Sequence, residues 1–568
     1  MTCYYAGDFE TTTNEEETEV WLSCFAKVVD YDKLDTFKVN TSLEDFLKAL
    51  YLDLDKTYTD TGEDEFIIFF HNLKFDGSFL LSFFLNNDIE CTYFINDMGV
   101  WYSITLEFPD FTLTFRDSLK ILNFSIATMA GLFKMPIAKG TTPLLKHKPE
   151  VIKPEWIDYI HVDVAILARG IFAMYYEENF SKYTSASEAL TEFKRIFRKS
   201  KRKFRDFFPI LDEKVDDFCR KAYRGGWTFA NPKTQGRTLK QLIDIYDINS
   251  MYPATMLQNA LPIGAPKRYK GKPKQIKEDH YYIFHIKADF DLKRGYLPTI
   301  QIKKKLDALR IGVRTSDYVT TSKNEVIDLY LTNFDLDLFV KHYDATIMYI
   351  ETLEFQTESE LFDDYITTYR YKKENAQSPA EKQKAKIMLN SLYGKFGAKI
   401  ISVKKIAYLD DKGILRFKND DEEEVQPVYA PVALFVTSIA RHFIISNAQE
   451  NYDNFLYADT DSLHLFYSDS LVLDIDPSEF GKWAHEGRAV KAKYLRSKLY
   501  IEELIQEDGT THLDVKGAGM TPEIKEKITF ENFVIGATFE GKRASKQVKG
   551  GTLIYETTFK IRETDYLV

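Results

Sequence analysis

The sequence predicts a multidomain protein of mixed α/β and α+β class. Its 568 residues correspond to about three or four domain-sized units, taking ~150 residues for each. The segment EFIIFFHN (65–72) has the continuous apolar pattern of a buried strand, and DGSFLLSFFLNN (76–87) has the pattern of a following helix. No fixed repeat unites the chain, so the units are expected to differ from one another.

The composition is that of a soluble globular protein, with 44% hydrophobic and 28% charged residues. Cys3, Cys24, Cys91 and Cys219 lie far apart and form no C-x-x-C pair, so neither a zinc site nor a disulfide framework is expected, and a reducing cytosol fits. The N-terminus lacks the basic and apolar regions of a signal peptide. No apolar run approaches the ~20 residues that span a bilayer, so we expect no membrane partner.

The net charge of −11 argues weakly against a polyanionic partner, but three segments are locally basic: 194–205, 267–277 and 302–305. These segments could meet phosphate groups. The alternative that they are solvated helix faces and loops remains open.

The later elements follow from turn and cap residues. A polar stretch at 181–190 suggests a domain boundary near residue 185, and strands and loops are expected over 260–360. Ser378 and Pro379 predict the start of a helix that ends near Gly397. Residues 405–417 predict a hairpin that turns at Asp410–Gly413 and precedes the acidic run 419–424, and a mixed segment follows residue 517.

Two carboxylates occur close together in NFLYADTDSLHLF (454–466). If this segment is one strand, period-2 alternation places Phe455, Tyr457, Asp459 and Asp461 on one face. Burying two unpaired carboxylates costs on the order of several kcal/mol, so a cation is expected beside them.

Mg²⁺ prefers carboxylate oxygens together with substrate phosphates, and another carboxylate is needed. Asp247, at the end of the strand-like LIDIYDI (242–248), is the best candidate. A strand-end Asp facing a D-T-D hairpin can hold two metals roughly 3.5–4 Å apart for in-line phosphoryl transfer. A turn or a solvent-facing pair is the alternative explanation of Asp459 and Asp461.

The predicted helix 378–397 places Lys386, Asn390 and Tyr393 on one face, at i, i+4 and i+7. The lysine could neutralise triphosphate charge, and the tyrosine could stack on a base. An ordinary amphipathic helix, with Ile387, Leu389 and Leu392 toward the core, is the alternative.

A second acidic set lies near the N-terminus. Asp8 and Glu10 share a strand face, Asp76 follows the buried strand, and Tyr159 and Asp163 lie one helical turn apart. Four carboxylates and a tyrosine suit a two-metal nuclease.

Taken together, these motifs resemble those of the family B DNA polymerases. DFE, NLKFD and Y-x-x-x-D resemble the three exonuclease motifs, and DINSMYP, KIMLNSLYG and YADTDS resemble polymerase motifs A, B and C. KLY (498–500) resembles the K-x-Y motif, and AYRGG (222–226) resembles the loop between the two domains. The resemblance implies an RNase-H-like 3′–5′ exonuclease domain and a right hand of palm, fingers and thumb.

Within that family, the chain is most similar to the protein-primed polymerases of phages with linear double-stranded DNA genomes. The chain is short, and about 130 residues separate motifs A and B, which leaves room for an insertion that contacts the priming (terminal) protein. The hairpin after motif B matches a second insertion that encircles DNA. The implied domains are exonuclease 1–185, palm 186–258 and 431–517, insertion 1 259–361, fingers 362–396, insertion 2 397–430 and thumb 518–568.

The resemblance also implies individual roles. The exonuclease metals would be bound by Asp8, Glu10, Asp76 and Asp163, with Tyr159 orienting water, Lys139 assisting, and the single strand held by Asn72, Phe75, Ser118 and Leu119. The polymerase metals would be bound by Asp247, Asp461, the Ile248 carbonyl and the neighbouring Asp459. The nucleotide would be held by Tyr252, Lys373, Lys386, Asn390 and Tyr393, and DNA by Tyr223, Gly225, Gly226, Lys498 and Tyr500, the last two alternating on one strand face.

The implied function is a proofreading, strand-displacing DNA polymerase that uses deoxynucleotides and two Mg²⁺ (or Mn²⁺) ions at each active site. Its partners would be template, primer and priming protein, as a monomer or a 1:1 heterodimer in the host cytoplasm. One alternative is a nuclease whose C-terminal half binds DNA, although Lys386 and Tyr252 have no evident use there. Another is a non-enzymatic processivity module, which leaves both carboxylate sets unexplained.

Overall fold

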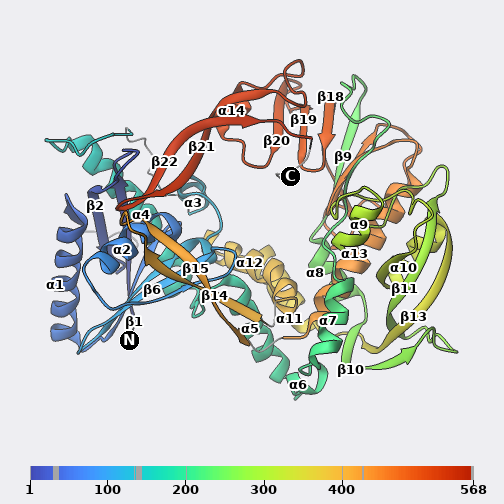
Figure 1. Cartoon of the computed structure of the whole chain (residues 1–568), viewed down its shortest axis with the longest axis horizontal. Helices are drawn as coiled ribbons and strands as arrows, with labels where there is room; N and C mark the ends of the chain where they lie inside the picture. The colour runs from blue at the N-terminus through green and yellow to red at the C-terminus, as the bar shows by residue number, and fades with distance from the viewer. Residues whose placement is uncertain are drawn as a thin grey trace.

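The computed structural model describes residues 2–29, 37–133, 135, 144–199, 201–398, 401–424 and 428–563. Lys139 lies outside these residues. In Figure 1 the N-terminal sheet and its helices lie at the left, and a second seven-stranded sheet lies toward the upper right.

The N-terminal sheet has the order β3-β2-β1-β4-β7-β6-β5, and β1, β4 and β7 run parallel. Helices α1 and α2 pack on one face, and α3 and α4 pack on the other. The predicted strand and helix are confirmed as β4 and α2, although α2 begins earlier than predicted, so Asp76 lies in its first turn. The elements are β1 (Thr2–Thr11), β2 (Val20–Lys27), β3 (Lys38–Asn40), α1 (Leu43–Thr61), β4 (Glu65–Phe70), α2 (Leu73–Asn86), β5 (Thr92–Ile95), β6 (Trp101–Glu107), β7 (Thr112–Asp117), η1 (Ser118–Lys120), α3 (Ile126–Leu132), α4 (Pro154–Phe172) and η2 (Ala173–Glu177).

Helices follow this sheet. The stretch 181–190 is not simply a polar linker, because α5 begins at Ser185 and buries Ala189, Leu190 and Phe193. Its polar residues stabilise the turn that precedes α5, because the Glu188 carboxylate accepts hydrogen bonds from the backbone N–H groups of Ser181 and Lys182. The elements are α5 (Ser185–Lys199), α6 (Phe204–Phe207) and α7 (Glu213–Ala222).

The second seven-stranded sheet has the order β20-β19-β18-β9-β17-β16-β8. The segment 454–466 is not one strand: β16 ends at Asp459, Thr460 is left-handed with φ +62°, and β17 begins at Ser462. Asp459 and Asp461 therefore flank a tight turn instead of sharing a strand face. The elements are β8 (Thr228–Ala230), β9 (Ile243–Ile248), α8 (Met251–Gln258), α13 (Ala430–Glu450), β16 (Phe455–Asp459), β17 (Ser462–Phe466), β18 (Trp483–Arg496), β19 (Leu499–Ile505) and β20 (Thr511–Gly517).

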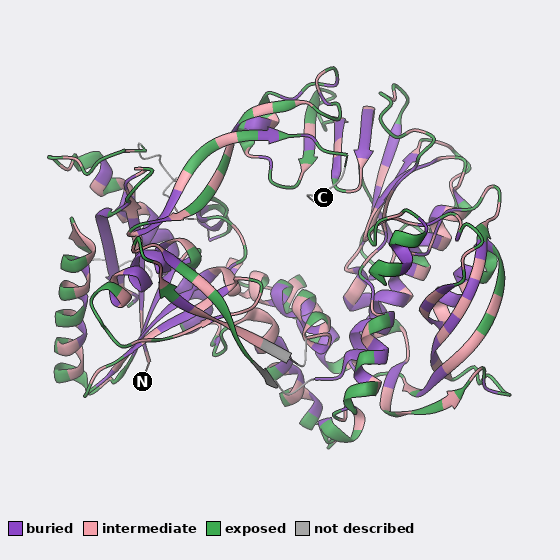
Figure 2. Ribbon diagram, viewed as in Figure 1, coloured by how far each residue is buried: buried purple, intermediate pink, exposed green. Residues whose placement is uncertain are grey.

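Helix α13 passes behind this sheet. It is the one helix of the described residues that is long and apolar enough, by length and composition, to cross a membrane. Since 72% of its apolar stretch is buried inside the protein, α13 has the environment of a core helix. Figure 2 shows this burial along the ribbon.

The segment after α8 forms a four-stranded sheet of order β10-β13-β11-β12. The expected strands over 260–360 are confirmed, but two helices were missed because their contacts with this sheet are long-range, as for Phe339 of α10. The elements are β10 (Leu261–Lys270), β11 (His280–Leu292), α9 (Lys305–Arg310), β12 (Ile327–Thr332), α10 (Asn333–His342) and β13 (Tyr343–Glu358).

Helices α11 (Asp363–Glu374) and α12 (Pro379–Phe396) come next, and α12 packs against α5. The predicted cap is confirmed, because the Ser378 side chain accepts a hydrogen bond from the Glu381 backbone N–H. The predicted core residues Ile387, Leu389 and Leu392 are buried.

Two hairpins complete the chain. The predicted hairpin is confirmed as β14 (Ile401–Leu409) and β15 (Leu415–Glu424), but the acidic run belongs to β15 instead of following it. After α14 (Pro522–Glu526), β21 (Thr538–Val548) and β22 (Gly551–Lys560) reach back to the N-terminal domain (Figure 1). At their tip, the Thr18 backbone N–H donates to the Lys549 carbonyl over 2.9 Å, and Lys549 pairs with Glu17. Lys549 also forms a β-bridge with Ile414 of the β14–β15 turn, so three parts of the chain meet at this tip.

Candidate active site

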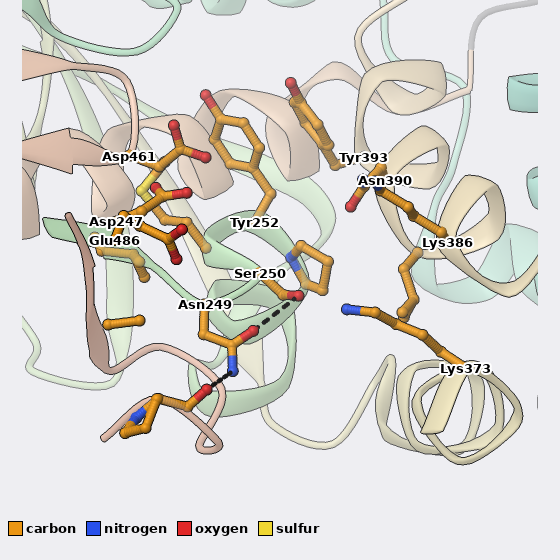
Figure 3. A pocket seen from close by; sticks show the side chains of 16 residues that line it. Asp247, Asn249, Ser250, Tyr252, Lys373, Lys386, Asn390, Tyr393, Asp461 and Glu486 are labelled. Atoms are coloured by element: carbon orange, nitrogen blue, oxygen red, sulfur yellow. Dashed lines mark hydrogen bonds between the residues drawn. The ribbon is translucent and has the colours of Figure 1, made fainter. Parts of the chain in front are cut away.

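The D-T-D turn (residues 459–461) lies against the end of β9. In the sheet register Ser462 is opposite Asp247, and the Ile248 backbone N–H donates to the Asp461 carbonyl over 2.9 Å. The structure therefore brings Asp247 and Asp461 together from segments more than 200 residues apart in sequence, as the prediction required. Both carboxylates line one pocket (Figure 3).

The electrostatics of this pair favour a bound cation. Burial, together with repulsion from Asp461 and Glu486, raises the pKa of Asp247 to about 7. Burial and the nearby Asp459 raise the pKa of Asp461. The Asp247 Oδ1 atom is buried without a hydrogen-bond partner. A divalent cation fits here, because it would supply the missing partner and remove the repulsion.

Asp459 differs from the other two carboxylates. Its Oδ1 accepts hydrogen bonds from the hydroxyls of Thr228 (3.0 Å) and Thr460 (3.1 Å), and Lys498 Nζ lies 3.8 Å away. It does not line the pocket that contains Asp247 and Asp461. This placement agrees with the prediction that Asp459 lies close to the metal site while Asp247 and Asp461 are its main ligands.

The pocket has a volume of about 660 Å³ and opens between the second sheet and α11 and α12. Lys373 and Lys386 face the carboxylates from the opposite wall, with Asn390 beside them (Figure 3). Burial and the charge of Lys386 lower the pKa of Lys373, and an anion bound between the two lysines would offset their repulsion. The alternative that the helix 378–397 is merely amphipathic does not account for this cationic wall.

Two tyrosines form the floor between the acidic and basic walls. The ring centroids of Tyr252, in the first turn of α8, and Tyr393, on α12, lie 4.2 Å apart. The Ile248 backbone also lines the pocket. The volume and the separated charges suit a nucleoside triphosphate with its phosphates between lysines and metal.

A second acidic site lies at the carboxyl ends of β1 and β4. Asp8 and Glu10 are half-buried on one face of β1, and Asp76 is buried in the first turn of α2. Burial and the charges of Glu10 and Asp117 raise the pKa of Asp76 well above its usual range, and Asp76 Oδ1 has no hydrogen-bond partner. These groups also fit a cation.

Helix α4 completes this site. Burial and the nearby carboxylates Asp163, Glu10 and Asp8 raise the pKa of Tyr159, so its hydroxyl stays protonated and can donate. The predicted i, i+4 relation of Tyr159 and Asp163 on one helix is confirmed. The structure thus assembles the five residues predicted for this site.

Comparisons with known proteins also indicate a DNA polymerase. A sequence profile described as "DNA polymerase type B, organellar and viral" matches residues 57–151 and 145–480. The chain belongs to the organellar and viral type B DNA polymerases. It is 95% identical to the DNA polymerase of Streptococcus phage Cp-1 over 100% of both chains, and 35% identical to that of Bacillus phage phi29 over 98% of this chain and 99% of the other.

Solved structures show the same architecture. A phi29 DNA polymerase with primer-template DNA and incoming nucleotide is 35% identical, with a TM-score of 0.88 over 99% of this chain and 100% of that one. A phi29 complex with primer-template DNA alone gives 0.89 at 34% identity, over the same shares of the two chains. The predicted family and the fold of exonuclease, palm, fingers and thumb are therefore confirmed. We call the second seven-stranded sheet, which carries motifs A and C, the palm sheet and the pocket beside it the palm pocket. Nucleotide substrates and divalent metals are general requirements of this family.

Other predicted residues of this polymerase lie as follows. Asn72 is exposed with φ +78° at the start of α2, and Phe75 and Leu119 are half-buried nearby. Ser118 is fully buried, and its hydroxyl donates to the Phe70 carbonyl over 3.1 Å. Its side chain therefore forms its hydrogen bonds inside the protein, with the Phe70 carbonyl and the His71 ring.

Lys498 and Tyr500 do not alternate along one strand face, which corrects the sequence prediction. Lys498 lies in the turn before β19 with φ +56°, and only Tyr500 lies in the strand. The Tyr457 hydroxyl accepts a hydrogen bond from the Lys498 backbone N–H over 2.8 Å, which directs the lysine toward Asp459. A turn is required here because β18 and β19 are antiparallel neighbours.

Sequence reasoning missed two residues. Glu486 lines the palm pocket and adds to the repulsion at Asp247. Asp117, at the end of β7, accepts hydrogen bonds from the backbone N–H groups of Asn72 (3.2 Å) and Leu119 (3.0 Å). The position of Asp117 at the carboxyl end of a third parallel strand was a usable signal, whereas nothing local marks Glu486.

The three basic segments are partly engaged within the protein. Ion pairs join Arg202 to Glu358, Lys277 to Glu354 and Lys304 to Asp328. Each basic segment thus has at least one residue in an ion pair within the protein, and these three residues remain partly exposed. Within the described ranges no group of three or more His, Cys, Asp or Glu side chains is arranged to hold a metal ion by itself.

Proposed function

We propose that this polymerase extends DNA at the palm pocket and removes mispaired 3′ ends at the N-terminal acidic site. One observation carries the proposal: two separate carboxylate sets exist, and only the palm set shares a pocket with Lys373 and Lys386. Each site would use two Mg²⁺ or Mn²⁺ ions.

In the palm, Asp247, Asp461 and the Ile248 carbonyl would hold the metals, with Asp459 beside them. Metals held there would supply activation of the primer hydroxyl and stabilisation of the leaving pyrophosphate. Lys373 and Lys386 would neutralise the triphosphate, and Asn390 and Tyr393 would complete the nucleotide pocket. Tyr223, Gly225, Lys498 and Tyr500 would steady the primer-template.

In the exonuclease site, the metals would be held by Asp8, Glu10, Asp76 and Asp163. Tyr159 would orient the attacking water, because its hydroxyl remains a donor beside Asp163. Asn72, Phe75, Leu119 and the buried Ser118 would shape the groove for a frayed strand. Lys139 stays a predicted auxiliary residue of this site.

Tyr252→Val is expected to raise the incorporation of ribonucleotides at least about tenfold, equivalent to ~1.4 kcal/mol. The Tyr252 ring packs on Tyr393 at the pocket floor, where it would clash with a 2′-OH. The measurement is single-turnover addition of a ribonucleotide and the matching deoxynucleotide. Tyr252→Phe is the matched control, since it keeps the ring. An unchanged ratio for Tyr252→Val would mean that the ring only fills the palm core.

We propose protein-primed initiation, supported by the four-stranded insertion between motifs A and B. Incubation with labelled deoxyadenosine triphosphate, Mg²⁺ and candidate priming proteins should give a covalent nucleotide adduct on one of them. Asp461→Asn should give none. Elongation of a DNA primer without any adduct would leave a DNA polymerase that starts from nucleic-acid primers.

We further propose that the β14–β15 hairpin supports processive strand displacement. It packs on the exonuclease domain, where the Ala407 backbone N–H donates to the Tyr93 hydroxyl over 2.8 Å and Phe417 packs against Trp101. Through Ile414 it also touches the tip of the β21–β22 hairpin. These contacts support a closed ring around DNA.

Replacing residues 403–421 by a short Gly–Ser linker should spare addition of one nucleotide but shorten products on a primed circle. The loss should be greatest with a downstream blocking strand, because the enzyme could neither stay bound nor separate the strands. Asp411→Ala, in the exposed turn, is the control. Full-length products from the deletion variant on both templates would contradict the proposed role.

The domain boundaries, a monomer or a 1:1 complex with the priming protein, and a place in the host cytoplasm belong to the same proposal. Primer extension separates it from a nuclease with a DNA-binding C-terminal half. Mg²⁺-dependent degradation of single strands separates it from a non-enzymatic processivity module.

A further inference from the structure

The loop between α7 and β8 (residues 223–227) touches the D-T-D turn. The Thr460 backbone N–H donates to the Trp227 carbonyl over 2.9 Å. A Cβ atom placed on Gly226 would lie 2.7 Å from Thr460 Cγ2 and 3.0 Å from its Cβ and Oγ1. Only a residue without a side chain fits against Thr460 at this position.

Thr460 is an unusual residue for its conformation. Its φ of +62° is left-handed, which β-branched residues rarely adopt. The Trp227 hydrogen bond and the Gly226 contact hold Thr460 there, and its hydroxyl donates to Asp459 Oδ1 over 3.1 Å. A shift of Thr460 would therefore move both flanking carboxylates.

The loop is also fixed from behind. Arg441 of α13 donates from Nη1 to the carbonyls of Arg224 (2.7 Å) and Gly225 (2.8 Å). Its Nη2 donates to both carboxylate oxygens of Asp335, at 2.9 and 2.8 Å. Arg441 is 3% and Asp335 7% exposed, so a buried ion pair holds Arg441 in place. The loop therefore cannot retreat from Thr460 without losing its hydrogen bonds to Arg441.

We propose that Gly226 and Arg441 are positioning residues for nucleotide addition. They hold Thr460 in its left-handed conformation and thereby set the places of Asp459 and Asp461. The inference rests on the proposed metal-binding role of these carboxylates. It gives Gly226 a role through the catalytic turn, whereas the family resemblance implied direct DNA contact.

Gly226→Ala should lower single-nucleotide addition about 100-fold, the effect of misplacing catalytic groups by about 1 Å. The Mg²⁺ concentration for half-maximal addition should rise, while the dissociation constant for primer-template should stay within about twofold. Degradation of single-stranded DNA should persist, which shows that the variant is folded. Arg441→Lys should give the same pattern, because a lysine cannot bond both carbonyls and Asp335 together.

Rescue distinguishes positioning from a general defect. Thr460→Gly removes the atoms that a Cβ on residue 226 would meet, and glycine accepts the left-handed conformation. Gly226→Ala/Thr460→Gly should therefore add nucleotides at nearly the rate of Thr460→Gly alone. If the second substitution restores nothing, the inference is wrong.

Gly225→Ala separates the two explanations of the loop. A Cβ on Gly225 meets nothing within 4 Å, so Gly225→Ala should leave the Mg²⁺ concentration for half-maximal addition unchanged, whatever its effect on primer-template binding. Equal rises in the DNA dissociation constant for both variants would overturn the inference in favour of direct DNA contact. If the wild-type chain added no nucleotide, the proposed function would fail. The contact between residue 226 and Thr460 could still be tested by melting temperature, which Gly226→Ala should lower and the added Thr460→Gly should restore.

Discussion

Asp247→Asn and Asp461→Asn should each reduce nucleotide addition by several orders of magnitude, because each removes a metal ligand from the palm pocket. Degradation of single-stranded DNA should continue, since its carboxylates lie in a different domain. Single-turnover addition to a primer-template, and hydrolysis of a labelled single strand, measure the two activities. Equal loss of both activities would indicate a shared site or a misfolded protein.

A stability measurement provides an internal control for Asp247→Asn. The pKa of Asp247 in the folded protein is about 7, above its unfolded value, so ionisation of this group destabilises the metal-free fold as pH rises from about 4 to 7. At pH 8 without metal, Asp247→Asn should therefore melt at a higher temperature than wild type, and at pH 4 the gain should vanish. A variant that is more stable but inactive cannot owe its inactivity to misfolding.

Replacing both Asp8 and Glu10 by Ala should remove 3′–5′ degradation by several orders of magnitude and leave extension of matched primers. The pair lies on one face of β1, and Glu10 contributes to the raised pKa of Asp76, so the double change empties the centre of the site. Trimming of a mismatched primer end, measured without nucleotides, is the test. Asp60→Ala, an exposed acid on α1, is the control, and wild-type trimming by the double variant would refute the assignment.

Local patterns determined much of this protein. The period of 2 in β1 placed Asp8 with Glu10, and the period of 3.6 in α12 placed Lys386 with Asn390 and Tyr393. Ser378 marked the start of α12 because its capping hydrogen bond reaches only three residues along the chain. These features depend on neighbouring residues, so they can be read before the fold is known.

Other features were decided by tertiary structure. Asp459 and Asp461 flank a turn because β16 and β17 pair as antiparallel neighbours, and the Thr460 backbone N–H at this turn donates to the Trp227 carbonyl. The antiparallel pairing of β18 and β19 likewise places Lys498 in a turn.

The contributions of Glu486 and Arg441 to the palm also required the folded chain. Glu486 raises the pKa of Asp247 although more than 200 residues separate them in sequence, and Arg441 fixes a loop from a helix equally distant along the chain. Such contacts are set by the order of strands in the palm sheet and the packing of α13 behind it. The sequence thus predicted which residues would carry the chemistry. The register and the packing decided the distances between them, because electrostatic and steric effects act through space and not along the chain.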